Sequence, residues 1–141
     1  MLNKEQIMEI IPHRDPFLLI DEVTSLEPGI KVSANKYIRE DEYYFKGHFP
    51  NNPVVPGVIL IETIAQAGAV CILTLPKYKG KTAYFAGINK AKFKKKVLPG
   101  THLTLELEVI KTLGNIGIGS GKAIDGDGDL VASCELTFAV E

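Results

Sequence analysis

The 141-residue sequence contains no tryptophan, only two cysteines and almost no net charge. Cys71 lies in an apolar run and Cys134 in a strand-like segment, so they indicate neither a disulfide framework nor a zinc site. Two unclustered cysteines fit a reducing, cytoplasmic compartment. The 16 basic and 17 acidic residues nearly cancel, so the overall charge favours neither nucleic acid nor a membrane surface as a partner.

Motifs for metals and nucleotides are also missing. The acidic run at 125–129 lacks the Gly and Glu that a calcium loop has at its sixth and twelfth positions, which here are Leu130 and Leu136. A hairpin turn is the better interpretation of this run. The glycines at 117–121 lie inside a strand pattern, whereas a nucleotide-binding loop joins a strand to a helix. The three histidines are too dispersed to form a metal site: His13, His48 and His102.

Neither a signal peptide nor a membrane span is predicted. Residues 1–14 are charged and amphipathic and lack the apolar core of a signal peptide. The apolar run at 57–75 is interrupted by Glu62, Thr63 and Gln66 and is marginal in length for a bilayer. We expect one domain over residues 1–141, because a chain of this size buries about two thirds of its unfolded surface without disulfides or metals.

The chain is organised around a proline-rich loop at 47–57 and the apolar segment after it. From Gly57 to Leu75 the sequence is apolar on nearly every side, which predicts a helix buried in the core. His48, the free N–H groups of the helix start and the carboxyl of Glu62 therefore converge near one helix N-terminus. Three prolines stiffen the loop: Pro50, Pro53 and Pro56.

The remaining elements predict an α+β fold. A short helix at 4–11 begins at the N-cap Asn3, with Gln6 completing a capping box. One long core helix followed by antiparallel strands predicts a curved sheet wrapped around that helix. Glycines at 117, 119 and 121 suggest close backbone approach to it. Exposed sheet edges favour pairing with a second copy, so we expect a homodimer. Strands are expected at 17–27, 31–39, 82–89, 91–97, 103–109, 116–124 and 130–140.

Two residues are candidates for proton transfer. His48 either acts as a general base, since histidine titrates near neutral pH, or only bonds a nearby carbonyl. Glu62 is either a surface carboxylate or a general acid. Its apolar neighbours leave no polar helix face, so we favour a buried carboxyl that is paired or protonated, as an acid donor must be.

Other polar groups near the helix each have two interpretations. Gln66, four residues after Glu62, either positions Glu62, a water or the substrate, or satisfies a core carbonyl. The Gly57 N–H either polarises a thioester or ester carbonyl or serves the helix start. Five clustered lysines either dock an acidic partner, which we favour, or protect an edge strand. They are Lys90, Lys92, Lys94, Lys95 and Lys96.

The pattern Gly-His-Phe-Pro-x-x-Pro-x-x-Pro-Gly at 47–57, followed by Glu62 and Gln66, resembles the 3-hydroxyacyl-[acyl-carrier-protein] dehydratases of type II fatty-acid synthesis. The likeness covers nearly the whole chain and includes Ile-Pro-His-Arg at 11–14 and Tyr-Phe-Ala-Gly-Ile at 84–88. It implies the hotdog fold, in which a sheet wraps one long central helix. It also implies dimers whose sheets join, and often a trimer of such dimers.

The resemblance implies a role for each candidate. His48 of one subunit is the base and Glu62 of the other is the acid. The Gly57 N–H binds the thioester carbonyl, and Val55 and Gln66 contact the substrate. The substrate is a (3R)-3-hydroxyacyl chain on the phosphopantetheine of acyl carrier protein, and no metal or redox cofactor is implied. The glutamate separates this chain from the related dehydratase-isomerase, which carries Asp at that position.

Some positions depart from the family pattern, and two alternative functions stay open. Asp15 stands where an aromatic is common, Lys96 replaces a usual proline, and 101–102 replace a usual Asp-Gln pair. A hotdog acyl thioesterase would use a carboxylate-activated water. A non-catalytic acyl-thioester-binding protein would usually carry a DNA-binding extension, for which the chain leaves no room. Sequence alone assigns no role to His13, Arg14 or His102. It determines neither the preferred acyl-chain length nor whether the protein is a dimer or a hexamer.

Overall fold

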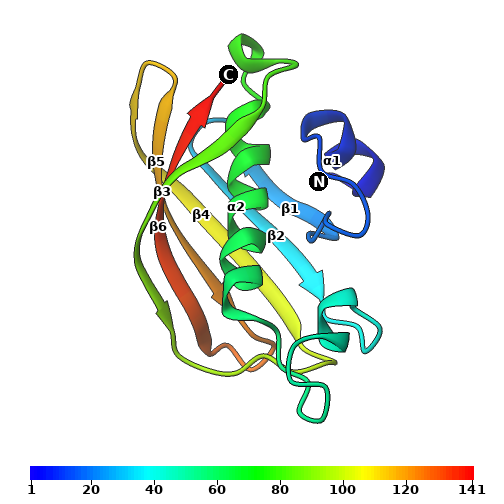
Figure 1. The fold of residues 1–141 in the computed structure, drawn as a ribbon. Coiled ribbons are helices and arrows are strands. Elements are labelled where there is room, and N and C mark those ends of the chain that lie inside the picture. The colour runs from blue at the N-terminus through cyan, green and yellow to red at the C-terminus, as the bar shows by residue number, and fades with distance from the viewer.

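Six strands and one long helix form most of the structure, a computed structural model that describes all 141 residues. The strands make one sheet in the order β1-β2-β4-β5-β6-β3, and every neighbouring pair is antiparallel. The sheet curves around α2, which confirms the predicted α+β hotdog arrangement (Figure 1). The helices are α1 (Lys4–Ile10), α2 (Gly57–Leu73) and two short 3₁₀ helices, η1 (Tyr43–Lys46) and η2 (Pro76–Tyr78). The strands are β1 (Glu22–Glu27), β2 (Lys31–Tyr37), β3 (Ala83–Phe93), β4 (His102–Leu113), β5 (Ile116–Ile124) and β6 (Leu130–Val140).

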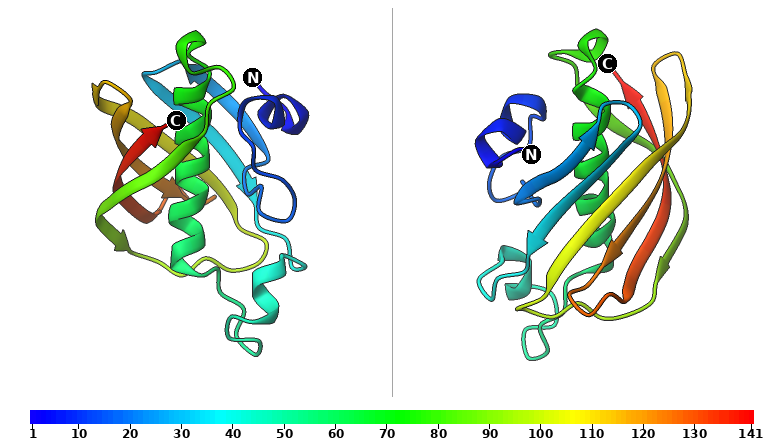
Figure 2. Two further views of the ribbon diagram at one scale, coloured as in Figure 1. Left: turned by 45° about the horizontal axis from the view of Figure 1, so that its top comes forward. Right: turned by 180° about the vertical axis from the view of Figure 1, so that it is seen from behind.

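Helix α2 forms the centre of the core, as its apolar sequence predicts. Nearly every residue from Leu60 to Leu73 is buried, and both views in Figure 2 show the sheet curving around this helix. The helix ends two residues earlier than expected. Thr74 caps it, because its hydroxyl donates to the carbonyls of Val70 and Cys71 at 2.9 Å each. None of the helices is both long and apolar enough to cross a bilayer.

Two glycines of β5 allow the sheet to approach α2 closely, as predicted. A Cβ at Gly121 would overlap the side chain of Ile64, and one at Gly117 would lie 3.3 Å from Ile72 Cδ1. Gly119 serves a different contact, because its missing Cβ would meet Leu107 on the neighbouring strand at 3.0 Å. Any larger residue at 121 would push the sheet away from the helix.

Three of the expected strands differ clearly from the structure, and β4 runs four residues beyond the expected end at 109. Only Glu22–Glu27 of the segment 17–27 is a strand, and Gln66 on α2 binds the backbone of the preceding residues. The two strands expected at 82–89 and 91–97 are one strand, β3, which ends at Phe93. Lys90 adopts a positive φ of 54°, and the pairing with β6 shifts register between Asn89 and Lys92. This bulge bends β3 without ending it.

Strand β3 is an open edge of the sheet. It pairs only with β6, and all of its residues are exposed or half-buried. Four of the exposed side chains are large and apolar: Tyr84, Phe85, Ile88 and Phe93. Exposed apolar side chains on an edge strand are typical of a surface that another chain covers.

Candidate active site

His48 lies on the loop between η1 and α2. Figure 2 shows this loop beyond the N-terminal end of the helix. Its Nδ1 is 2.8 Å from the carbonyl oxygen of Val54. Because a carbonyl oxygen can only accept, Nδ1 carries the proton, and Nε2 of the neutral ring keeps a free lone pair. The ring of Phe49, whose φ is +49°, packs on the imidazole with centroids 4.1 Å apart. The predicted bond to a carbonyl is therefore present, and it leaves Nε2 available for the general-base role, which stays a prediction.

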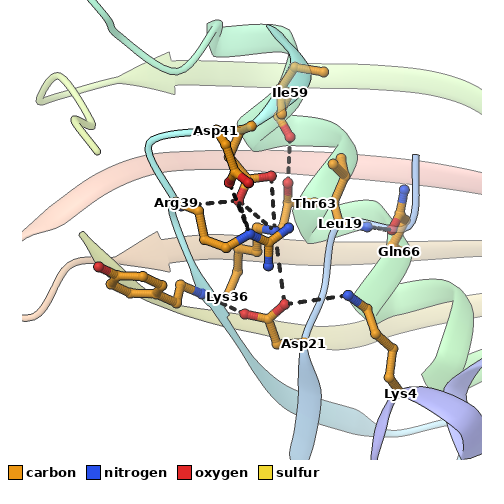
Figure 3. A network of polar contacts seen from close by, with 11 residues as sticks. Lys4, Leu19, Asp21, Lys36, Arg39, Asp41, Ile59, Thr63 and Gln66 are labelled. Carbon is orange, nitrogen blue, oxygen red and sulfur yellow. Dashed lines mark hydrogen bonds and ion pairs between the residues drawn. The ribbon is translucent and has the colours of Figure 1, made fainter. Parts of the chain in front are cut away.

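A buried ion pair fixes the start of this loop. Lys36 on β2 and Glu42, just before η1, have side chains only 3% and 6% exposed, and Lys36 Nζ lies 3.1 Å from Glu42 Oε2. The same carboxylate accepts the backbone N–H of Arg39 at 3.0 Å. Asp21 holds the end of β2 by accepting the Tyr37 N–H at 2.7 Å, as part of the network in Figure 3. These contacts set where η1 begins and therefore where His48 lies.

The N-terminus of α2 faces the same cavity as His48. Pro56, the N-cap residue, provides no side-chain cap, and the Gly57 N–H has no partner within the chain. Free N–H groups at a helix start favour negative charge. The ring of Phe93 lies against Gly57, where a Cβ would come within 2.9 Å of it. The cavity has a volume of about 420 Å³ and is lined by His48, Val54, Val55, Gly57, Leu60, Phe93 and residues 94–97.

Glu62 lies in a second, smaller cavity of about 200 Å³. Its side chain is half-buried, and its Oε2 accepts a hydrogen bond of 3.0 Å from Gln66 Nε2. The rest of this cavity is lined by three alanines, Gln66 and the rings of His13, Phe17, Tyr84, Phe85 and Phe138. The carboxyl is therefore only partly shielded from water, which is less burial than the apolar sequence around it predicts, and it accepts a hydrogen bond from a neutral donor.

Both polar atoms of the Gln66 side-chain amide form hydrogen bonds within the chain. Its Oε1 accepts the N–H of Leu19 at 2.8 Å, and its Nε2 donates to the carbonyl of Phe17 at 2.8 Å as well as to Glu62. Both interpretations made from the sequence therefore hold: the side chain satisfies the backbone and positions Glu62. The segment 17–19 is tied to α2 through this one residue.

His13 is the neighbour of Glu62 for which sequence alone gave no role. Its Nε2 lies 3.6 Å from Glu62 Oε2, and its buried Nδ1 has no partner. Burial lowers the pKa of His13, and this outweighs the nearby carboxylate, which raises it; Arg14 lowers it further. Arg14 itself holds the end of α1, because its guanidinium donates to the carbonyls of Met8, Ile11 and His13. The segment after α1 lies against α2 only in the folded chain, so its sequence alone does not predict the contact between His13 and Glu62.

The predicted site residues fall into two groups. His48, Val55 and Gly57 line one cavity, whereas Glu62 and Gln66 line the other. Each cavity borders one end of β3: Ala83, Tyr84 and Phe85 lie beside Glu62, and Phe93 lies beside His48. His102 belongs to neither group and packs on the ring of Tyr37.

All five candidate lysines are exposed, but they differ in their partners. Lys95 Nζ lies 2.7 Å from Asp125, 2.9 Å from Asp129 and 3.8 Å from Asp127. The acidic run forms the predicted turn between β5 and β6, and its three carboxylates gather within 4.8 Å of one another. The lysine ammonium is bound to all three of them. Lys94, Lys95 and Lys96 border the His48 cavity.

Comparison with known proteins identifies the family. A model described as a FabA-like domain matches residues 11–135. The chain belongs to the FabA-like family.

Its relatives carry a consistent name. This FabA-like chain is 52% identical over 139 residues to a protein of Clostridium novyi named 3-hydroxyacyl-[acyl-carrier-protein] dehydratase FabZ, covering 99% of this chain and 97% of the relative. It is 53% identical over 139 residues to a protein of the same name from Enterococcus faecalis, covering 99% and 98%.

Solved structures share the fold at low sequence identity. The dehydratase heterocomplex ApeI:P from Xenorhabdus doucetiae matches with a TM-score of 0.80 at 17% identity, over 94% of this chain and 89% of that chain. A hypothetical thioesterase with coenzyme A from Streptococcus pneumoniae matches with a TM-score of 0.67 at 13% identity, over 85% and 84%. These two likenesses concern the fold alone.

Proposed function

We propose that the protein dehydrates (3R)-3-hydroxyacyl-[acyl-carrier-protein] to the trans-2-enoyl form and water during fatty-acid elongation. Relatives that are about half identical over nearly the full chain carry the corresponding name. The observation that carries the chemistry is the His48 imidazole, whose Nε2 is free, in one cavity with an unpaired helix N-terminus. A base beside an electropositive backbone group suits removal of a proton next to a carbonyl. The unpaired buried cysteines fit the cytoplasm.

The placement of the two cavities supports a site shared between two subunits. If two copies pair antiparallel through β3, the start of one strand lies beside the end of the other. The cavity of Glu62 then adjoins the cavity of His48 in the partner subunit. The same pairing covers the exposed apolar side chains of β3. We therefore propose a homodimer with two shared sites, and a trimer of such dimers as the larger assembly.

In this dimer, His48 Nε2 removes a proton from C2 of the substrate. The Gly57 N–H and the α2 dipole stabilise the negative charge that develops on the thioester oxygen. Glu62 of the partner subunit donates its proton to the departing 3-hydroxyl, and water leaves. The proton on His48 then passes through solvent to restore Glu62. The C2–H and C3–O bonds break as the C2=C3 double bond forms, with no net oxidation or reduction, so the proposed steps call for no redox cofactor. His48, Glu62 and the Gly57 N–H supply the base, the acid and the charge stabilisation without a metal.

The remaining residues bind and orient the substrate. Val55, which is buried and lines the His48 cavity, contacts the substrate near the thioester. Gln66 holds Glu62 and borders the substrate on the other side. Two exposed lysines beside the cavity that have no ion-pair partner, Lys94 and Lys96, attract the acidic acyl carrier protein and bring its phosphopantetheine arm to the opening.

An assay with 3-hydroxybutyryl carrier protein tests this function directly. The proposed reaction gives a conjugated enoyl thioester, followed by its ultraviolet absorbance, and releases no free thiol. A thioesterase would release free thiol without the enoyl absorbance, and a binding protein would give neither signal. Either of these two results would end the dehydratase assignment.

A further inference from the structure

Lys95 and the turn between β5 and β6 form a contact that the proposed chemistry does not use. We define the acidic turn as residues 125–129. Lys95 is in the segment just after β3 and meets Asp125, Asp127 and Asp129 from across the turn. Lys95 is 30 or more positions from these aspartates in the sequence, so the contact joins the segment after β3 to the turn between β5 and β6.

Asp125 makes two different kinds of contact with its two oxygens. Oδ1 accepts the N–H groups of Asp127 and Asp129 at 3.0 Å each, which closes the turn. Oδ2 lies 2.7 Å from Lys95 Nζ. Its side chain is 7% exposed, whereas that of Asp127 is 84% exposed. Hydrogen bonding to Lys95, and then to the Asp129 N–H, lowers the pKa of Asp125, so it stays charged at neutral pH.

The segment that Lys95 anchors is a wall of the His48 cavity. Residues 94–97 line this cavity together with His48 and Gly57. Two backbone bonds hold the ends of the segment, because Lys94 N–H donates to Val131 O at 2.8 Å and Val97 O accepts the Val55 N–H at 2.9 Å. Between these bonds, the contact of Lys95 with the acidic turn is the interaction that holds the segment to the sheet.

We propose that Lys95 and Asp125 are positioning residues that hold the 94–97 wall against the His48 cavity. Lys95 is thereby withdrawn from carrier docking, because its charge is already neutralised by the acidic turn. The neighbouring Lys94 and Lys96, which have no ion-pair partner in the chain, are left for that role. The effect on catalysis rests on the proposed dehydratase function, whereas the anchoring of the wall does not.

Two matched variants separate positioning from docking. Asp125→Asn keeps an Oδ1 that accepts both turn N–H groups but removes the charge that faces Lys95. Asp127→Asn removes one charge from the same turn at an exposed position 3.8 Å from Lys95, and serves as the control. Activity is measured with a 3-hydroxyacyl group on the carrier protein and with the same group on pantetheine alone.

A positioning role predicts that Asp125→Asn lowers kcat/KM by about two- to tenfold on both substrates. Asp127→Asn stays near the unsubstituted protein, Lys95→Met matches Asp125→Asn, and Lys95→Arg restores most of the activity. A docking role for Lys95 predicts a different pattern. Lys95→Met would then lower activity on the carrier-bound substrate alone, and Asp125→Asn would lower the KM for that substrate. This pattern, or unchanged activity on the pantetheine substrate, would overturn the proposal.

Backbone amide exchange tests the anchoring without any assay of activity. In Asp125→Asn the amides of residues 94–97 should exchange several-fold faster, and in Asp127→Asn they should not. Equal exchange in both variants would contradict the anchoring. If the unsubstituted protein forms no enoyl thioester, the proposed function fails, and the exchange result still decides whether Lys95 holds the wall.

Discussion

The Glu62 cavity and the His48 cavity differ in what holds their reactive groups. Glu62 lies on the central helix and is fixed by Gln66, whose amide also binds the backbone of 17–19. His48 lies on a loop, and its position depends on a carbonyl contact within the loop and on a buried ion pair at the loop's start. Glu62 is thus held by a neutral hydrogen bond from the central helix, whereas the position of His48 depends on a loop carbonyl and on a buried ion pair.

In the proposed dimer, each chain supplies two halves of a site that it does not complete alone. Each half borders one end of the open edge strand β3 and has its own supporting contacts. The supports of one half do not touch the reactive group of the other. Substitutions should therefore disable the halves separately, and the predictions below use this independence.

The largest effect is expected from removing the base. His48→Ala should lower turnover by about 10²–10⁴-fold, the usual contribution of general acid–base catalysis. The fold should persist, because the imidazole makes only one hydrogen bond, to Val54 O, within the chain. Steady-state rates with the 3-hydroxybutyryl carrier protein measure the loss. Normal turnover in this variant would remove His48 from the mechanism.

Breaking the buried ion pair should mainly lower stability. Lys36→Met removes the closest cation from the buried Glu42 carboxylate and leaves Arg39 Nε at 3.7 Å as its remaining ion-pair partner. The free energy of unfolding should therefore fall by up to about 3–5 kcal/mol, the usual cost of breaking a buried ion pair. Urea denaturation measures this loss. The double variant Lys36→Met/Glu42→Gln serves as the control, because it also removes the buried charge of Glu42 and should recover much of the stability. If Lys36→Met is as stable as the unsubstituted protein, the ion pair does not anchor the His48 loop.

A smaller effect is expected from the amide that holds the acid. Gln66→Ala removes the hydrogen bond to Glu62 and leaves the Leu19 N–H and Phe17 carbonyl unpaired, at about 1–3 kcal/mol for each unsatisfied group. Both stability and kcat should fall, whereas the hydrogen bond between His48 Nδ1 and Val54 O within the loop should persist. The His48 ring signals in an NMR spectrum report on this point. A variant that loses stability but keeps its kcat would show that Gln66 supports the fold without positioning Glu62.

The smallest effect is a dependence of stability on pH that comes from His13. Its pKa is lower in the folded protein than in the unfolded chain, so between these two values the unfolded chain binds more protons. The stabilisation is therefore complete above the unfolded pKa, near 6.5, and is lost as pH falls through the folded pKa. Denaturation curves measured from pH 7 to pH 5 should show a shallower decline for His13→Gln. Identical slopes would show that His13 does not titrate differently on folding.

The sequence was sufficient to predict those features that depend on local pattern. Helix α2, the capping box of α1 and the glycines of β5 that face the helix follow from apolar spacing, cap chemistry and the absence of a Cβ. The sequence predicts two strands where the structure has the single strand β3, because the bulge at Lys90 resembles a strand end in the sequence. The sequence also predicts a strand at 17–21, whereas the backbone of Phe17 and Leu19 hydrogen-bonds to the Gln66 amide on α2.

Contacts between distant segments could not be predicted in the same way. Lys36 has the sequence of an exposed strand residue, and its burial depends on Glu42 folding back beyond the strand end. The approach of His13 to Glu62 depends on how the segment after α1 crosses α2. Lys95 looked like one of five equivalent docking lysines until the acidic turn was placed beside it. In each case the local pattern gives the residue type, and only the fold gives the partner.

Mixing two inactive variants tests the shared site most directly. In a dimer of one His48→Ala chain and one Glu62→Ala chain, one site loses both groups and the other keeps both. If equal amounts of the two chains are refolded together and pair at random, half of the dimers are mixed, and a shared site predicts recovery of about a quarter of the unsubstituted activity. Activity no higher than that of each variant alone, with mixed dimers shown to be present, would contradict a site built from His48 of one subunit and Glu62 of the other.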